Sequence, residues 1–168
     1  MFSLITRTHV TGLSGREITD FLANCDDEAF RRWWPGTHFQ LHTVRGAPGT
    51  IGSIILMDEM IGQKRVKIRC ELVELVPGRK LVWQVRRPLF RLPVKLIFAL
   101  NDDDTGVEVE HAIEAGYAGA AAMLDPVLRL FFPARFAADK DEHVLKELPR
   151  LKAMLRGESS LVGKPQGY

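Results

Sequence analysis

The stretch VKIRCELVELVPGRKLVWQVR, which runs from Val66 to Arg86, decides the fold. Apolar and polar side chains alternate on both sides of a turn, and a period of two residues is typical of a strand with one buried and one solvated face. The turn, Val76-Pro77-Gly78-Arg79, contains the Pro-Gly pair that reverses a chain. The stretch therefore predicts two antiparallel strands whose inner row is Val66, Ile68, Cys70, Leu72, Leu81, Trp83 and Val85.

More strands follow the same rule on either side of this hairpin. A strand is expected at Phe2–Val10, and another at Phe39–Val44. The hairpin signal Asp102-Asp103-Asp104-Thr105-Gly106 separates two later strands. Their inner rows are Val94, Leu96, Phe98 and Leu100, and then Val107, Val109, His111 and Ile113. His111 is thus expected on an apolar face.

Two short helices are predicted between the first strand and the others. Ser14 and Glu17 fit the S-x-x-E capping box, in which each residue satisfies a free backbone donor of the other. Asp26 can cap a second helix, which Pro35-Gly36 ends because proline cannot continue the hydrogen-bond ladder.

The C-terminal region has a helical period that is interrupted by two prolines. From Ala118 onward the apolar spacing is that of a helix, which Pro126 and Pro133 should break into parts. The polar face of the last part includes Lys140 and Glu147, which are expected in solvent. The full order predicts an α+β fold. A curved antiparallel sheet of about seven strands would wrap around a long C-terminal helix, with two short helices after the first strand.

Length and composition suit one globular domain. The chain has 168 residues, 46% of them hydrophobic and 26% charged. We expect a single domain over residues 1–157 and a mobile tail over residues 158–168. The polar interruptions near the N-terminus do not fit a secretory signal, and no apolar run approaches the roughly 20 residues that span a bilayer, so a cytoplasmic protein is expected. Cys25 and Cys70 lack CxxC spacing, and no disulfide is expected.

Charge is distributed unevenly along the chain. Residues 61–100 contain ten Lys or Arg and two Glu, whereas residues 101–125 contain seven acidic and no basic residues. Pairing of these segments on adjacent strands would neutralise both. A basic surface for phosphates or anionic lipid is the alternative. Nucleic acid is not expected as a partner, because aromatic residues are not interleaved with the basic ones.

The chain resembles the START-like, or SRPBCC, superfamily, which includes polyketide cyclase-like and birch-pollen-allergen-like proteins. Three segments carry this resemblance: Gly49–Gly52, which enters a strand; Val73–Trp83, a turn followed by a strand tryptophan; and Thr105–His111, which is similar to the superfamily's last hairpin. The resemblance extends from about Phe2 to Leu155. It implies a helix-grip fold with an elongated cavity between the sheet and the C-terminal helix, used across the superfamily for hydrophobic ligands.

The predicted cavity wall combines the inner strand rows with apolar residues of the C-terminal region. Its members are Ile55, Met57, Ile68, Cys70, Trp83, Val85, Leu96, Phe98, Val109, His111, Ile113, Leu128, Phe132 and Phe136. His111 and His42 are the candidates for acid or base catalysis, or for one orienting polar contact, because an imidazole titrates near neutrality. Ordinary core packing is the alternative for the histidines and for the aromatic residues.

No metal and no cofactor are expected from the motifs. The five histidines show no H-E-x-x-H spacing. The chain also lacks a G-x-S-x-G elbow and a phosphate-binding loop.

Two further features bear on partners. The stretch Ile54–Met57 is apolar on both faces, so early helices or a second copy should cover it, and a homodimer is a candidate assembly. Arg86–Pro93 and Met123–Arg135 combine bulky apolar residues with arginines. These two segments could touch a membrane surface at the cavity rim. The favoured interpretation is that Leu128, Phe131 and Phe132 plug the end of the cavity.

Together these observations predict binding or transport of a hydrophobic small molecule, which would be lipid-like, isoprenoid or polycyclic. A cyclase or dehydratase that uses His111 as acid or base is the first alternative. An interaction module that acts through the Ile54–Met57 strand is the second.

Overall fold

The computed structural model describes residues 1–89, 91–117 and 119–158 of the chain. One antiparallel sheet contains β1 (Phe2–Thr11), β2 (His38–Arg45), β3 (Ile54–Ile61), β4 (Lys64–Val76), β5 (Lys80–Arg86), β6 (Arg91–Asp102) and β7 (Gly106–Ala115). The strand order is β1-β7-β6-β5-β4-β3-β2. The first strand therefore pairs with the last, and β2 lies at the opposite edge. Phe90 lies outside the described residues, and so does the predicted tail apart from its first residue, Glu158.

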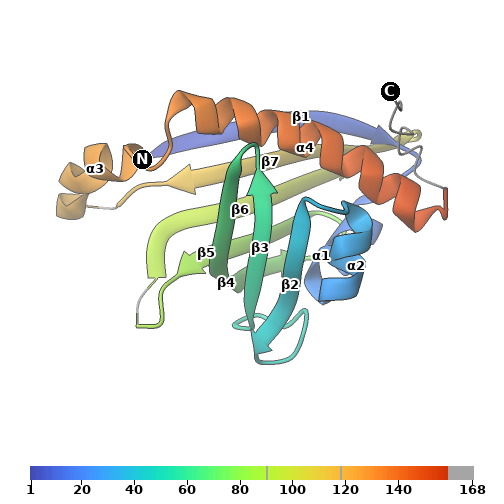
Figure 1. Cartoon of the computed structure of the whole chain (residues 1–168), viewed down its shortest axis with the longest axis horizontal. Helices are drawn as coiled ribbons and strands as arrows, with labels where there is room; N and C mark the ends of the chain where they lie inside the picture. Colours follow the sequence, from blue (N-terminus) through green and yellow to red (C-terminus); the bar gives the residue numbers. More distant parts are fainter. Residues whose placement is uncertain (90, 118, 159–168) are drawn as a thin grey trace, which may run out of the picture.

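The helices lie at the ends and on one face of this sheet (Figure 1). They are α1 (Gly15–Asn24), α2 (Asp27–Trp33), the 3-10 helix η1 (Gly119–Leu124), α3 (Asp125–Arg129) and α4 (Ala134–Leu155). The long helix α4 packs against β1, β3 and α2. The predicted α+β class, with a curved antiparallel sheet around one long C-terminal helix, is confirmed.

Local signals in the sequence set the helix ends. The Ser14 hydroxyl accepts a hydrogen bond from the Glu17 amide, and the Glu17 carboxylate accepts one from the Ser14 amide, which completes the capping box. Asp26 caps α2 by accepting from the Ala29 amide at 2.8 Å. After Pro133, α4 begins at Ala134. The C-terminal region is thus divided where the prolines predict.

The alternation in the Val66–Arg86 stretch places its apolar row in the core. Cys70, Leu72, Leu81 and Trp83 are each at most 1% exposed. On the opposite face, Glu71 of β4 binds Arg86 of β5 and Arg91 of β6. These three residues all belong to the basic segment 61–100, so their ion pairs do not test the predicted pairing with the acidic segment. The strand register does place Lys95 of β6 opposite Glu114 of β7.

Strand β3 is buried on both faces for part of its length. Ile55 and Met57 belong to the core cluster under the sheet. Ile54, on the other face, is only 8% exposed in the isolated chain, and Leu56 is half-buried. The chain itself covers most of this strand, and the homodimer stays a prediction.

Candidate functional site

A cavity of about 630 Å³ lies between the sheet and α4. Residues of β3 to β7 form one wall, and residues of α2, α3 and α4 form the other. Most of the lining is apolar, with a small polar group that includes Glu59, His111, Lys140, His143 and Glu147. A mostly apolar cavity with a few polar side chains is typical of a small-molecule site.

Most of the residues predicted for the cavity wall line this cavity. They are Met57, Ile68, Trp83, Val85, Leu96, Phe98, His111, Ile113, Leu128, Phe132 and Phe136. Ile55, Cys70 and Val109 do not line it, although they are buried in the core. The period of two identifies the inner face of a strand correctly. It does not show that the cavity occupies only part of that face while core side chains fill the rest.

His42 lies outside the cavity. Its Nδ1 is 2.7 Å from Oδ1 of Asp27, and the ring is half-buried on β2. The same carboxylate accepts a hydrogen bond from the Leu41 amide. His42 therefore joins α2 to the edge strand and is not placed to contact a ligand in the cavity.

His111 does face the cavity. The ring lies 4.5 Å from that of Phe98, measured between centroids, and its buried Nδ1 has no hydrogen-bond partner among the described residues. Burial, together with the nearby charges of Lys140 and His143, lowers the pKa of His111 to about 3. The imidazole is therefore neutral near pH 7 and offers one polar atom to the cavity.

Exposed apolar side chains surround the outer end of the cavity. Leu124, Val127 and Phe131 line the cavity and are also 49%, 57% and 66% exposed. The plug interpretation is wrong for Phe131, which is exposed because η1 and α3 extend beyond the sheet (Figure 1). Leu128 and Phe132 are half-buried and pack against the core.

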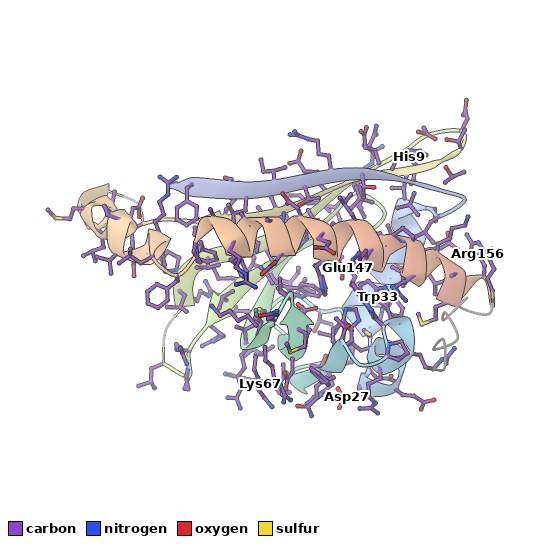
Figure 2. All side chains as sticks on the ribbon, turned by 45° about the horizontal axis from the view of Figure 1, so that its top comes forward. His9, Asp27, Trp33, Lys67, Glu147 and Arg156 are labelled. Atoms are coloured by element: carbon purple, nitrogen blue, oxygen red, sulfur yellow. The ribbon has the colours of Figure 1, made fainter. Side chains whose placement is uncertain are left out.

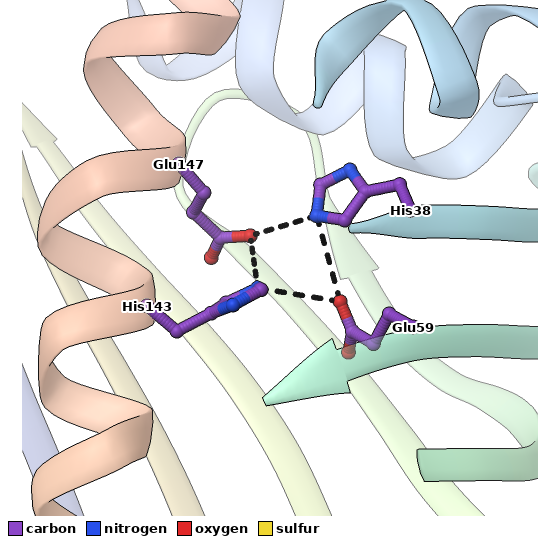
Figure 3. Close-up of side chains that lie close together, drawn as sticks. All are labelled: His38, Glu59, His143 and Glu147. Carbon is purple, nitrogen blue, oxygen red and sulfur yellow. Dashed lines mark ion pairs between the residues drawn. The ribbon is translucent and has the colours of Figure 1, made fainter. Parts of the chain in front are cut away.

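Four titratable side chains meet at the inner end of the cavity (Figure 3). His38 and Glu59 are directly opposite each other in the β2–β3 pairing, and His143 and Glu147 are one turn apart on α4. All four residues are at most 9% exposed. We call these four residues the buried tetrad. A pair from the sheet and a pair from the helix thus face each other across the core.

The histidine and carboxylate atoms of the buried tetrad lie close together without forming hydrogen bonds. His143 Nε2 is 3.3 Å from Glu147 Oε2 and 3.4 Å from Glu59 Oε2. His38 Nε2 is 3.8 Å and 3.6 Å from the same two oxygens. Both Nε2 atoms are buried and have no hydrogen-bond partner among the described residues. Each nitrogen thus points between two carboxylates.

The tetrad changes the acidity of its members. Burial lowers the pKa of His143, but Glu147 and Glu59 outweigh this effect and raise it to about 10. Burial and the charge of His143 lower the pKa of His38 to about 3. Burial raises the pKa of Glu147, and the charge of His143 opposes the change. Without another cation, His143 is therefore the charged imidazole of the tetrad.

Aromatic rings hold both imidazoles in place. The His38 ring stacks on Phe30 with 4.0 Å between centroids, and the His143 ring stacks on Trp34 at 4.8 Å. The Trp33 indole donates a hydrogen bond to the backbone carbonyl of Glu147 at 2.6 Å (Figure 2). The orientation of the tetrad is therefore fixed by packing from α2 and the loop after it.

The tetrad was not identified from the sequence, although part of its signal is present. The i, i+4 pair of His143 and Glu147 is a common arrangement of two ligands on one helix face. A rule that looks for two closely spaced histidines does not detect it, because only one of the pair is a histidine. His38 and Glu59 become neighbours only through strand pairing, which the sequence does not show at single-residue register.

Comparisons with known proteins give the fold. No family model and no curated protein match the chain. Solved structures do match: Ara h 8.0201 has a TM-score of 0.62 at 10% identity, over 93% of this chain and 98% of that one. Ginseng major latex-like protein 151 from Panax ginseng has a TM-score of 0.58 at 14% identity, over 84% of this chain and 96% of that one.

A third match is the Aha1 dimer from Colwellia psychrerythraea, with a TM-score of 0.54 at 14% identity, over 95% of this chain and 99% of that one. The chain has the START-like helix-grip fold. At these identities the helix-grip proteins share an architecture, and function must be argued from the site.

Proposed function

We propose that this helix-grip protein binds a hydrophobic small molecule in the cavity between sheet and α4. The observation that carries the proposal is the cavity itself, whose volume of about 630 Å³ lies within the range of roughly 300–1,000 Å³ typical of ligand pockets. Burial of apolar surface, at about 25 cal/mol per Å² removed from water, would drive binding. Lipid-like, isoprenoid and polycyclic compounds are the classes that fit such a lining.

The polar end of the cavity supports a ligand with one polar group. His111 lines the cavity with a neutral imidazole, so its ring can form a hydrogen bond with a hydroxyl or carboxyl group of the ligand. The exposed apolar side chains Leu124 and Val127 of η1 and α3 line the cavity, which supports entry of an apolar ligand at that end.

The two alternatives, a cyclase or dehydratase that uses His111 and an interaction module that acts through Ile54–Met57, have less support. A pKa of about 3 makes His111 a weak base, so it is poorly matched to proton transfer near neutral pH. An interaction module acting through Ile54 and Leu56 needs those side chains exposed, whereas Ile54 is buried and Leu56 is half-buried.

The proposal is tested by filling the cavity. Ile68 projects from β4 into the cavity, and Ile68→Trp would occupy part of its volume. We expect at least a tenfold loss of affinity for cis-parinaric acid, a fluorescent fatty acid, measured by fluorescence titration and by competition with isoprenoid and polycyclic compounds.

Val44→Trp is the matched control, because Val44 is 42% exposed at the end of β2 and does not line the cavity. It should bind the probe as the wild type does. Equal affinity of the wild type and Ile68→Trp, at unchanged thermal stability, would contradict binding in this cavity.

A further inference from the structure

The buried tetrad has an unusual combination of burial and missing contacts. His38 is 1% exposed, and neither of its ring nitrogens has a hydrogen-bond partner among the described residues. Buried polar atoms are normally satisfied, and leaving one unpaired costs about 1–3 kcal/mol. The unpaired Nε2 atoms of His38 and His143 both face the carboxylates of Glu59 and Glu147 (Figure 3). These atoms therefore need a common partner.

The nitrogen-to-oxygen distances in the tetrad are close to those around a tetrahedral metal ion. A metal with bonds of about 2.0–2.1 Å to nitrogen and oxygen places neighbouring ligand atoms about 3.3–3.4 Å apart. The four nitrogen-to-oxygen distances are 3.3, 3.4, 3.6 and 3.8 Å. Each distance joins one Nε2 atom to one Oε2 atom. Each nitrogen therefore has both carboxylate oxygens as neighbours, and each oxygen has both nitrogens. All four atoms lie within 4.8 Å of one another, which is wider than the tetrahedral edge, so the side chains must move closer together to complete a tetrahedron.

The charges of the tetrad also fit a divalent cation. When both imidazoles are neutral, as metal ligands are, the tetrad carries a total charge of about −2, which is costly inside a core unless it is compensated. Without a metal ion, the charge of His143 compensates only part of it. A divalent ion would neutralise it. Nitrogen ligands favour a transition metal, because Mg²⁺ and Ca²⁺ prefer sites made of oxygen alone.

The surroundings give the ion a rigid site and a route to it. Phe30 and Trp34 fix the two rings by stacking, which holds the ligand atoms in position. His143 also lines a second, smaller cavity of about 150 Å³ together with Thr37, Asp139 and Lys146. An ion can therefore reach His143 from this second cavity.

We propose that His38, Glu59, His143 and Glu147 bind one divalent transition-metal ion, with Zn²⁺ as the best match. The ligand atoms are the two Nε2 atoms and one oxygen of each carboxylate. Glu59, His143 and Glu147 also line the large cavity, so the ion lies at its inner wall. The site requires no apolar ligand, and its test is independent of the ligand proposal.

Metal binding is measured with Zn²⁺ alone on the full chain after removal of metal by a chelator. We expect one Zn²⁺ per chain after equilibrium dialysis, and a visible absorption spectrum typical of tetrahedral coordination when Co²⁺ replaces Zn²⁺. Zn²⁺ should also raise the melting temperature, because an ion that binds only the folded state stabilises it.

Variants assign the ion to the tetrad. Glu147→Gln and Glu59→Gln, on different elements, should each reduce Zn²⁺ affinity at least about 100-fold, more than the loss of an outer contact causes. Glu28→Gln is the matched control, because Glu28 is exposed on α2 and lines neither cavity. It should bind Zn²⁺ as the wild type does, and so should Ile68→Trp, which tests only the large cavity.

Two results would overturn the proposal. One is a wild-type protein that binds no stoichiometric Zn²⁺ and gives no tetrahedral Co²⁺ spectrum. The other is a folded Glu147→Gln or Glu59→Gln variant that binds Zn²⁺ with the same affinity as the wild type. Either result would show that the tetrad is a buried cluster of ion pairs and does not bind a metal.

Discussion

At the scale of single residues, Lys140 shows how a charge is accommodated in the core of this protein. The residue is 1% exposed, and its ammonium group donates hydrogen bonds to the Thr6 hydroxyl at 2.7 Å, the His111 carbonyl at 2.8 Å and the Leu4 carbonyl at 3.1 Å. Burial lowers the pKa of Lys140 to about 8, although Asp141 and Glu147 oppose the change. All three protons of the ammonium group thus have an acceptor. These hydrogen bonds join α4 to β1 and β7.

Lys140→Met should therefore destabilise the fold. The variant removes three hydrogen bonds at a buried position, and we expect the free energy of unfolding to fall by about 2 kcal/mol or more. Urea unfolding of the two proteins measures the change. Lys146→Met is the control, because Lys146 is exposed and pairs with Glu142 at i, i+4; its change should stay within about 0.5 kcal/mol. Equal losses in the two variants would show that the buried hydrogen bonds contribute nothing specific.

At the scale of elements, α1 is fixed at its first turn by two neighbours. Gly15 is buried against the β4–β5 turn, where a Cβ would lie 2.3 Å from the Gly78 carbonyl oxygen. Glu17 binds Arg156, which follows α4, with 3.0 Å between Oε2 and Nη2. The start of α1 thus connects the turn of one hairpin to the end of the long helix.

Gly15→Ala should reverse the usual effect of this substitution in a helix. Alanine is normally favoured over glycine by about 1 kcal/mol, but here the added Cβ meets backbone atoms that cannot move freely. We expect a destabilisation of about 1–3 kcal/mol, measured by chemical unfolding. Arg16→Ala, one residue further along α1, should change the stability by less than about 0.5 kcal/mol. A Gly15→Ala protein as stable as the wild type would show that α1 does not pack closely on the turn.

The Glu17–Arg156 pair should make stability depend on pH in the acidic range. The hydrogen bond from Arg156 lowers the pKa of Glu17 to about 2, from an ordinary value near 4.5. A lowered folded-state pKa stabilises the fold above pH 4.5, and this stabilisation is lost as the pH falls toward 2. The difference in unfolding free energy between the wild type and Glu17→Gln should therefore shrink between pH 4.5 and 2.

Glu28→Gln provides the comparison for this titration. Glu28 is exposed on α2 and forms no hydrogen bond or ion pair in the part of the chain that the structure describes. The difference between the wild type and this control should change less over the same range. If Glu17→Gln and Glu28→Gln behave alike, the ion pair between α1 and the end of α4 does not contribute to stability.

At the scale of the whole molecule, the architecture could be predicted because each strand and helix end has a local signal. The alternation from Val66 to Arg86, the capping box and Pro133 each act over a few residues. The wall of the cavity follows from the same alternation, with the exceptions of Ile55, Cys70 and Val109.

The polar end of the site depends on tertiary packing and could not be predicted in the same way. Lys140 and Glu147 lie on the polar face of α4 by sequence, and the fold nevertheless buries both. Their burial depends on where α4 crosses β1, β2 and β3, which no local pattern specifies. The same holds for His38 and Glu59, which become neighbours only when β2 and β3 pair.

The central claim is that the cavity holds an apolar molecule, and native mass spectrometry of the protein as purified from cells tests it most directly. The comparison is with the denatured mass, followed by extraction and identification of whatever is released. We predict a retained hydrophobic compound that is lost on denaturation. A ligand-free spectrum, together with no thermal shift from fatty acids, isoprenoids or polycyclic aromatics, would contradict the claim.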